Sequence, residues 1–358
     1  MNTSQRIIIT GAAGLIGQNL ITRLKNRKGL KIVGIDKHPA NVQILRQLNP
    51  EIEVIEADLA RPGGWEHVFE KGGTLILNHA QIGALTELPF IENNITATKN
   101  VLTAAKAAGL PYLVHISSSV VNSLAHDFYT ETKKVQEKLV LDSGIPACVL
   151  RPTLMYGWFD RKHLGWLARF MHKSPVFPVP GSGKYIRQPL YAGDFCNIII
   201  SAANNPRPNM IYDISGREKV YYIDLIRAVK KASRAKALIV RIPYAMFYVL
   251  MAAYALVDKN PPFTTQQLKA LDAPTRQQRR RAKAFKQGSV FDLSRSSILR
   301  ADDSVRSLQE EKTKLEERIK GSDSRVRKLE DLLHRQSQLS RPSSGTFGPD
   351  FPGSPASP

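Results

Sequence analysis

An α/β fold with a doubly wound parallel sheet is predicted for residues 1–150, and two observations predict it. Short runs of apolar, mostly β-branched residues recur at 6–10, 31–35 and 111–116. Segments with apolar residues at helical spacing follow these runs, so strands and helices alternate along the chain. Buried parallel strands are continuous apolar runs of this kind. After residue 150 the pattern changes, which predicts a smaller α+β region.

A glycine-rich turn follows the first apolar run and predicts a dinucleotide site. It lies between a strand at 6–10 and a helix that carries apolar residues over 15–24. Gly11 permits a tight turn, Gly14 lets backbone N–H groups approach a pyrophosphate, and Gly17 lets the helix pack against the strand. The helix N-terminus then faces the anion. The alternative is an ordinary glycine-rich turn between a strand and a helix.

An acid at the end of the second strand supports the dinucleotide interpretation. Asp36 lies about 20 residues after Gly17, the spacing at which a carboxylate accepts hydrogen bonds from the adenosine ribose. A carboxylate there disfavours a 2′-phosphate, so we expect NAD in preference to NADP. The basic neighbours Lys37 and His38 weaken that preference. The alternative is a solvated acid in a turn.

A tyrosine and a lysine four residues apart predict a proton-transfer site. Tyr129 and Lys133 share one face of a predicted helix that follows the strand at 111–116 and the serines at 117–119. A free tyrosine has a pKa near ~10, and a neighbouring ammonium favours its phenolate. A serine hydroxyl could hold the reacting oxygen beside the tyrosine. The alternative is a pair of ordinary helix-surface residues.

These motifs together resemble the extended short-chain dehydrogenase/reductase family, which includes sugar-nucleotide epimerases and dehydratases. The resemblance covers residues from about 6 to 271 and is carried by segments 10–17, 56–59, 78–80, 93–100, 151–152, 156–157 and 191–194. It implies a Rossmann fold and a catalytic set of Ser118, Tyr129 and Lys133, with Ser119 as the other candidate hydroxyl. It also implies a cofactor site made by Gly11, Gly14, Leu15, Ile16, Gly17, Asp36, Asp58, Leu59, His79, Ala80, Tyr129 and Lys133.

The resemblance implies an NAD-dependent epimerase or dehydrogenase/reductase that acts on a nucleotide sugar. Ser119 and Val120 stand where the family's dehydratases carry an acidic pair, which argues against 4,6-dehydration. The gap between Ser118 and Tyr129 is also short, about a dozen residues. The alternative is a catalytically weak scaffold protein that keeps the dinucleotide-binding fold.

Composition narrows the class of protein. Apolar residues make up 42% of the chain, enough for a core, and the formal net charge of +20 favours anionic ligands such as nucleotide diphosphates. No base-reading module is present, so specific nucleic-acid binding is not expected, and no metal site is expected. Cys148 and Cys196 lie in apolar segments, so no disulfide is implied. The first strand begins near residue 6, from which we expect no signal peptide and a cytoplasmic protein.

The remainder of the chain divides into a substrate-binding region, 151–272, and a distinct tail. Within 151–272 we expect a helix at 163–171 and a loop at 175–183. Lys184 and Arg187 follow that loop, where they could hold a substrate diphosphate or be exposed cations. The sequence 181–185 lacks the distal glycine and the Ser or Thr of a phosphate-binding P-loop.

The tail predicts self-association. We expect a basic linker at 273–301, a coiled coil at 302–338 from its apolar heptads, and disorder at 339–358, where Ser, Pro and Gly dominate. The heptads favour a homo-oligomer. Residues 242–257 are uncharged but fewer than the ~20 needed to span a bilayer. They suit a buried helix, and they also allow peripheral contact with a membrane.

Overall fold

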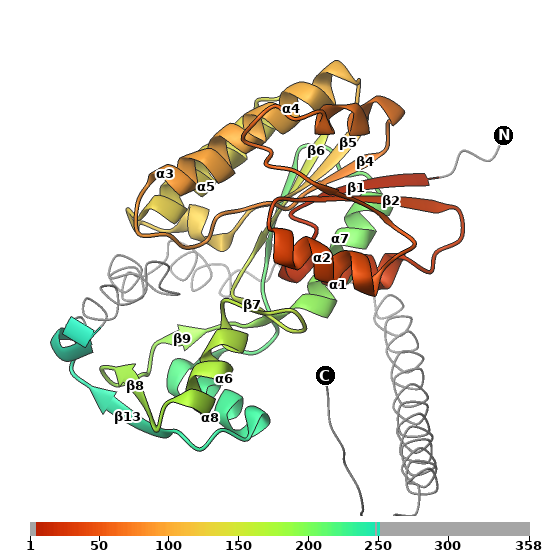
Figure 1. The fold of residues 1–358 in the computed structure, drawn as a ribbon. Helices are drawn as coiled ribbons and strands as arrows, with labels where there is room; N and C mark the ends of the chain where they lie inside the picture. The colour runs from red at the N-terminus through yellow and green to blue at the C-terminus, as the bar shows by residue number, and fades with distance from the viewer. Residues whose placement is uncertain (1–4, 248, 251–358) are drawn as a thin grey trace, which may run out of the picture. The chain divides into compact units, whose positions relative to one another are not determined.

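The computed structural model describes residues 5–247 and 249–250, and a seven-stranded sheet organises most of them. The strand order is β11-β6-β5-β4-β1-β2-β3, and every neighbouring pair is parallel. The predicted doubly wound parallel sheet is therefore confirmed (Figure 1). The strands are β1 (Gln5–Thr10), β2 (Leu30–Asp36), β3 (Glu53–Glu56), β4 (Thr74–Leu77), β5 (Tyr112–Ile116), β6 (Ala147–Pro152) and β11 (Met210–Ile214).

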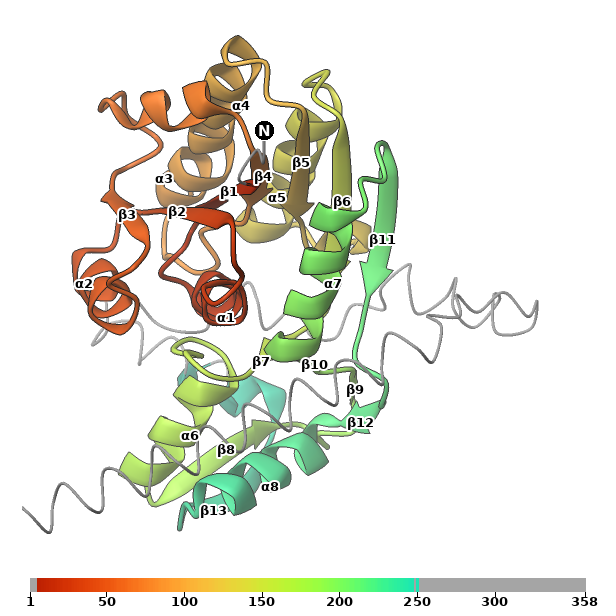
Figure 2. The ribbon, with the colours of Figure 1, turned by 90° about the vertical axis from the view of Figure 1, so that its right-hand side faces the viewer.

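Helices cover both faces of this sheet, as Figure 2 shows from the side. One face carries α1 (Leu15–Leu24), α2 (Pro39–Leu48) and α7 (Ala192–Asn204). The other carries α3 (Leu88–Phe90), the π-helical η2 (Ile91–Thr96), α4 (Ala97–Ala107), α5 (Phe128–Leu141) and the 3-10 turn η1 (Trp65–Lys71).

The side chains of β1 alternate between the two faces of the sheet, so this one apolar strand contributes to the core on each side. Successive strand residues point to opposite faces of a sheet. Ile7 and Ile9 accordingly join the core beneath α1 and α7, while Ile8 joins the core beneath α4 and α5. All three are at most 2% exposed. A strand that is apolar on both faces can lie only between two helical layers.

A smaller group of elements makes the second part of the fold. Its core packs Leu167, Phe177 and Ile226 together. Two short strand pairs flank it, β7 with β10 and β9 with β12. The elements are β7 (Met155–Tyr156), α6 (Leu164–Lys173), β8 (Val176–Pro180), β9 (Ile186–Arg187), β10 (Leu190–Tyr191), β12 (Val220–Tyr221), α8 (Tyr222–Ser233) and β13 (Leu238–Ile242).

The loop expected at 175–183 is wrong in part, because Val176–Pro180 forms strand β8. It pairs in parallel with β13, more than fifty residues later in the chain. Prolines at 178 and 180 suggested a loop, since proline has no N–H for a strand ladder. β8 has a neighbour on one side only, and edge strands tolerate proline. The helix expected at 163–171 is present as α6.

Residues 151–272 contribute to both parts of the fold, because β11 and α7 complete the seven-stranded sheet and its helical layer. The expected basic linker at 273–301, coiled coil at 302–338 and tail at 339–358 lie outside the described residues.

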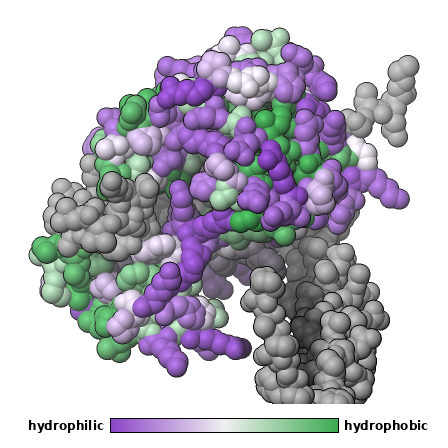
Figure 3. Space-filling view, viewed as in Figure 1, coloured by the Kyte–Doolittle hydropathy of each residue, from purple (hydrophilic) through white to green (hydrophobic). Residues whose placement is uncertain are grey.

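The uncharged segment 242–257 is described only as far as residue 250. Here Tyr244, Met246, Val249 and Leu250 are exposed, and Figure 3 shows hydrophobic side chains at the lower left of the molecule, in the region that follows β13. Across the described part of the chain, no helix combines the length and apolar character needed to cross a membrane.

Candidate functional site

The predicted site residues gather at one edge of the sheet. β1 ends at Thr10, β2 at Asp36, β4 at Leu77 and β5 at Ile116. Because these strands are parallel neighbours, their carboxyl ends share an edge, and the loops that follow them meet there. Ligands of open α/β sheets bind outside this edge.

The glycine turn after β1 has the geometry expected from its sequence. Gly11 adopts a left-handed φ of 65°, and a Cβ placed on it would lie 2.9 Å from the Cα of His79. On Gly17 a Cβ would lie 2.4 Å from the carbonyl oxygen of Ala12. A side chain fits at neither position, so the turn can close and α1 can pack against it. Gly14 caps the N-terminus of α1 without a side-chain bond.

Asp36 lies beside this turn. Its Oδ2 accepts a hydrogen bond from the Ala13 backbone N–H at 3.0 Å, and its Oδ1 accepts one from the His38 N–H at 3.0 Å. The carboxylate is therefore held at the turn, where an acid that selects the ribose must lie.

Lys37 points to a different carboxylate. Its Nζ lies 3.3 Å from Oδ2 of Asp58 and 2.6 Å from Oδ1 of Asn93. Asp58 also accepts the Ala60 N–H at 3.0 Å, and Leu59 beside it is buried. Lys37 is thus engaged with the loop after β3, which reduces its ability to offset the charge of Asp36.

The loop after β4 packs directly on the glycine turn. The Asn78 side chain donates to the carbonyl oxygen of Gly11 at 3.1 Å, and Nδ1 of His79 lies 2.9 Å from the Thr10 hydroxyl. Burial, together with the charges of the nearby Lys133 and Lys37, lowers the pKa of His79 to about 3, so this imidazole is neutral. Ala80 is exposed.

Tyr129 lies in the first turn of α5, and its hydroxyl is near enough to Ser118 for the serine to affect its pKa. Asp127 caps this helix by accepting the Thr130 N–H at 3.0 Å. Burial raises the pKa of Tyr129 above its ordinary value, the Ser118 hydroxyl opposes that rise, and the charge of Asp127 adds to it. The direction is opposite to the lowering of the pKa expected from a neighbouring ammonium, because burial is the largest cause and Lys133 does not contribute.

The three serines at 117–119, of which the resemblance favoured Ser118 and left Ser119 as the other candidate, have different surroundings. The Ser117 hydroxyl donates to Oε2 of Glu137 at 2.5 Å, beneath the surface. Ser118 lies near the Tyr129 hydroxyl. Ser119 begins the 3-10 turn η3 (Ser119–Asn122), whose N-cap is Ser118. Of the three, Ser118 is the one brought to the tyrosine.

Lys133, one helical turn after Tyr129, is buried, with only 1% of its surface exposed. Its Nζ donates to the Ile116 carbonyl at 3.0 Å and to Oε1 of Gln136 at 2.5 Å. Burial lowers the pKa of Lys133 to about 7, and the carboxylate of Glu137 opposes that effect. An ammonium with this pKa is only partly protonated at neutral pH.

Two buried residues of α5 were missed by the sequence reasoning. Gln136 bonds to Lys133 directly, and Glu137 bonds to Ser117 and to the Arg151 guanidinium. The signal was available, because they follow Lys133 by three and four residues and so share its helix face.

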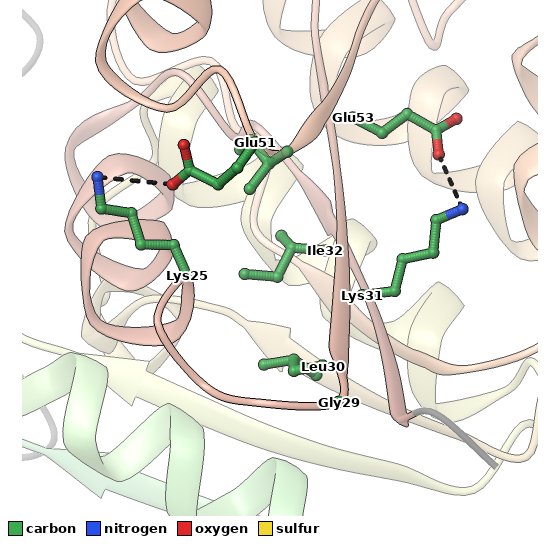
Figure 4. Close-up of a pocket in the computed structure, with 8 residues that line it drawn as sticks. Lys25, Gly29, Leu30, Lys31, Ile32, Glu51 and Glu53 are labelled. Carbon is green, nitrogen blue, oxygen red and sulfur yellow. Dashed lines mark ion pairs between the residues drawn. The ribbon is translucent and has the colours of Figure 1, made fainter. Parts of the chain in front are cut away.

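A pocket of about 420 Å³ lies at the opposite end of β2 from Asp36. It is lined by residues 29–32 and 51–53 with Lys25, and the Lys25–Glu51 and Lys31–Glu53 ion pairs border it (Figure 4). Seven strand residues rise about 20 Å. This pocket is therefore separate from the candidate site.

The glycine turn and its surroundings suit a dinucleotide. Neighbouring backbone atoms occupy the space that a side chain at Gly11 or Gly17 would need. The N-terminus of α1 follows the turn directly, and Asp36 accepts a hydrogen bond from the turn. Backbone N–H groups and a helix N-terminus bind phosphate, and the carboxylate suits ribose hydroxyls. These residues fit the cofactor predicted from the sequence.

Comparison with known proteins identifies two kinds of relative. Autophagy-related protein 11 of Aspergillus fumigatus is 78% identical over 95 residues, which are 26% of this chain; the chain spans only 8% of that relative's length. The 3 beta-hydroxysteroid dehydrogenase/Delta 5-->4-isomerase of Mycobacterium tuberculosis is 25% identical over 260 residues, covering 63% of this chain and 69% of that protein.

Among solved structures, the UDP-glucuronic acid 4-epimerase of Bacillus cereus in complex with NAD is similar, with a TM-score of 0.59 and 25% identity. The similarity covers 66% of this chain and 87% of the epimerase. The model of the NAD dependent epimerase/dehydratase family matches residues 7–215, which include the glycine turn, Ser118, Tyr129 and Lys133. That match confirms the expected cofactor, NAD, and the chain belongs to the NAD-dependent epimerase/dehydratase family.

Proposed function

We propose that this protein is an NAD-dependent oxidoreductase or epimerase that acts on a nucleotide sugar, with Tyr129 as the general acid and base. The placement of Ser118 near the Tyr129 hydroxyl, at the sheet edge that also carries the glycine turn, is the observation that carries the proposal. Bound NAD would supply the hydride acceptor for oxidation of a sugar hydroxyl. The turn at 11–17, with Leu15 and Ile16 at the start of α1, would hold its pyrophosphate, and Asp36 its adenosine ribose.

In this proposal each residue of the site has one role. Ser118 donates a hydrogen bond to the reacting sugar oxygen and aligns it with Tyr129. Tyr129 removes the proton from that oxygen and returns one when the carbonyl is reduced. Lys133, one helical turn after the tyrosine, supplies the positive charge that favours the phenolate and a ligand for the nicotinamide ribose. Leu59, Asp58, His79 and Ala80 border the cofactor.

Charge and aromatic side chains in the smaller part of the fold support an anionic, nucleotide-bearing substrate. The Arg187 guanidinium lies 4.8 Å from the centre of the Tyr185 ring, and Tyr185 stacks on Tyr222 at 4.7 Å. Burial lowers the pKa of Arg187 and nearby tyrosines raise it. With exposed Lys184, this arginine offers charge to a diphosphate. The Bacillus cereus relative, named for a UDP-sugar acid, agrees with this substrate class.

The test is a panel of UDP-, GDP- and dTDP-sugars incubated with the full chain and NAD. Product formation is followed by NADH absorbance for oxidation and by chromatography for epimerisation. We expect turnover of at least one sugar and none with Tyr129→Phe. A chain that binds NAD but turns over no sugar in the panel contradicts the proposal.

A second candidate is a scaffold protein that keeps the dinucleotide fold without turnover. The 95 residues shared at 78% identity with Autophagy-related protein 11 favour it, because the name of that relative denotes no enzyme activity. Self-association through the heptads at 302–338 would suit this role, as would peripheral membrane contact by the segment 242–257. The sugar panel separates the two candidates, since a scaffold binds NAD and leaves every sugar unchanged. Both candidates are proposed to act in the cytoplasm.

A further inference from the structure

A continuous chain of side-chain hydrogen bonds connects Lys133 to the glycine turn. Nζ of Lys133 lies 2.5 Å from Oε1 of Gln136, and Nε2 of Gln136 lies 2.9 Å from Oγ1 of Thr98. Nε2 of His79 lies 3.1 Å from the same threonine oxygen, and its Nδ1 lies 2.9 Å from Oγ1 of Thr10. The five residues come from α5, α4, the loop after β4 and the end of β1.

The chemistry of the donors assigns one direction to this chain. An ammonium only donates, so Gln136 must turn its oxygen to Lys133 and its NH₂ to Thr98. The Thr98 oxygen accepts that N–H, which leaves its own proton for Nε2 of His79. A neutral imidazole that accepts at Nε2 carries its proton on Nδ1, which then donates to Thr10. Each hydrogen bond of the chain then has one donor and one acceptor.

Burial makes the amide of Gln136 important to the lysine. Gln136 and Thr98 are fully buried, and a buried ammonium is costly unless acceptors surround it. The Ile116 carbonyl is one acceptor of Lys133, and the Gln136 side chain is the other. The carboxylate of Glu137 is bonded to Ser117 and Arg151 rather than to Nζ.

We propose that Gln136 is a positioning residue for Lys133, and that through Thr98 and His79 it couples the lysine to the glycine turn. The catalytic consequence rests on the proposed function, whereas the placement of Nζ does not. The amide holds Nζ against Ile116, on the helix face of Tyr129. Because His79 also packs on Gly11, where a Cβ would meet its Cα at 2.9 Å, a displaced turn would displace the hydrogen-bonded chain.

The experiment measures the titration of the Lys133 Nζ directly, by NMR of the full chain labelled with ¹⁵N-lysine and without substrate. The signal is assigned by its absence in Lys133→Met. In wild type it should titrate near the pKa of about 7 that burial produces. Gln136→Leu removes an acceptor of the charged form and should lower the midpoint by about one unit. Gln136→Glu places a carboxylate beside Nζ and should raise it.

The titration midpoint of Lys133 should shift in opposite directions in Gln136→Leu and Gln136→Glu, whose side chains are similar in size. A general disturbance of the helix would not produce shifts of opposite sign. The groups that also act on this lysine are Glu137 on α5, His79 in the loop after β4 and His115 on β5. All three are present in each variant, so they do not account for a difference between them. Thr98→Val keeps the bond between Gln136 and Lys133 and should shift the midpoint less than Gln136→Leu does.

A midpoint that is the same in Gln136→Leu, Gln136→Glu and wild type overturns the proposal. Should Gln136→Leu fail to fold, the isosteric Gln136→Glu alone carries the test, and a midpoint that does not rise refutes it. With any sugar found active in the panel, the pH profile of kcat should move with the NMR midpoint. A chain with no turnover but with the expected NMR shifts refutes the proposed function and leaves the positioning role intact.

Discussion

The Ser117 hydroxyl donates a 2.5 Å hydrogen bond to Oε2 of Glu137, and both side chains are at most 5% exposed. The same carboxylate accepts hydrogen bonds from two nitrogens of the Arg151 guanidinium, one of them at 3.0 Å. The hydrogen bond of Glu137 to the first serine of the triplet holds the end of β5 against α5. The next residue, Ser118, is then presented to Tyr129.

Glu137→Ala should lower the free energy of unfolding by about 3 kcal/mol, because it leaves the half-buried Arg151 charge without its main partner. Urea denaturation measures the loss. Glu131→Ala is the matched control on the same helix, since it breaks an exposed ion pair with Lys134 and should cost about 0.5 kcal/mol or less. Equal losses in the two variants would show that the Glu137 network contributes no more than a surface pair.

Tyr129→Phe should reduce turnover by roughly 10²–10⁴ while leaving the dissociation constant for NAD nearly unchanged. The hydroxyl is required for proton transfer, and the ring keeps the packing of the first turn of α5. Steady-state assays on an active sugar and a calorimetric NAD titration provide the two numbers. Wild-type turnover in the variant would remove Tyr129 from the mechanism.

Asp36→Ala should narrow the preference for NAD over NADP, since the carboxylate that repels a 2′-phosphate is lost. Asp36→Asn removes the charge but keeps the hydrogen bond to the turn, because the amide oxygen can still accept the Ala13 N–H that Asp36 accepts at 3.0 Å. The ratio of the two dissociation constants is measured in all three proteins. If neither variant alters the ratio, Asp36 does not lie at the ribose.

Gly17→Ala should destabilise the fold by about 1–3 kcal/mol and weaken NAD binding, because its Cβ would lie 2.4 Å from the carbonyl oxygen of Ala12. Backbone atoms surround this position and cannot rotate away. Gly63→Ala is the control, since the nearest atom to its Cβ is in the Trp65 ring at 3.5 Å. The midpoint of thermal unfolding and the affinity for NAD should both fall in Gly17→Ala and should stay unchanged in Gly63→Ala.

Lys133→Met should flatten the pH dependence of stability between about pH 7 and pH 10. Folded Lys133 has a pKa of about 7, whereas an unfolded lysine titrates near ~10.4. Between these values the unfolded state binds more protons, so the free energy of unfolding rises with pH, by about 1.4 kcal/mol per pH unit from this group. Urea denaturation across this range gives the slopes, and an identical slope in the variant would rule out the shifted lysine.

The sequence by itself determined those features that depend on residues near one another in the chain. The apolar run before Gly11, the three glycines and the helical spacing after them predicted a strand, a turn and a helix, and the structure contains all three. The alternation of strands and helices predicted the parallel sheet, and the glycine turn with Asp36 predicted NAD. Such patterns are readable because turn geometry and side-chain periodicity are local properties.

Only the tertiary structure decided the features made by residues distant in the chain. It placed Ser117 against a carboxylate 20 residues later and Ser118, the hydroxyl that the resemblance already favoured, near Tyr129. It made a strand of the proline-rich run 176–180 by pairing it with β13. It also joined Gln136 to Thr98, which lies 38 residues earlier on another helix. Partners, burial and the resulting charge states depend on packing between elements, which no spacing along the chain specifies.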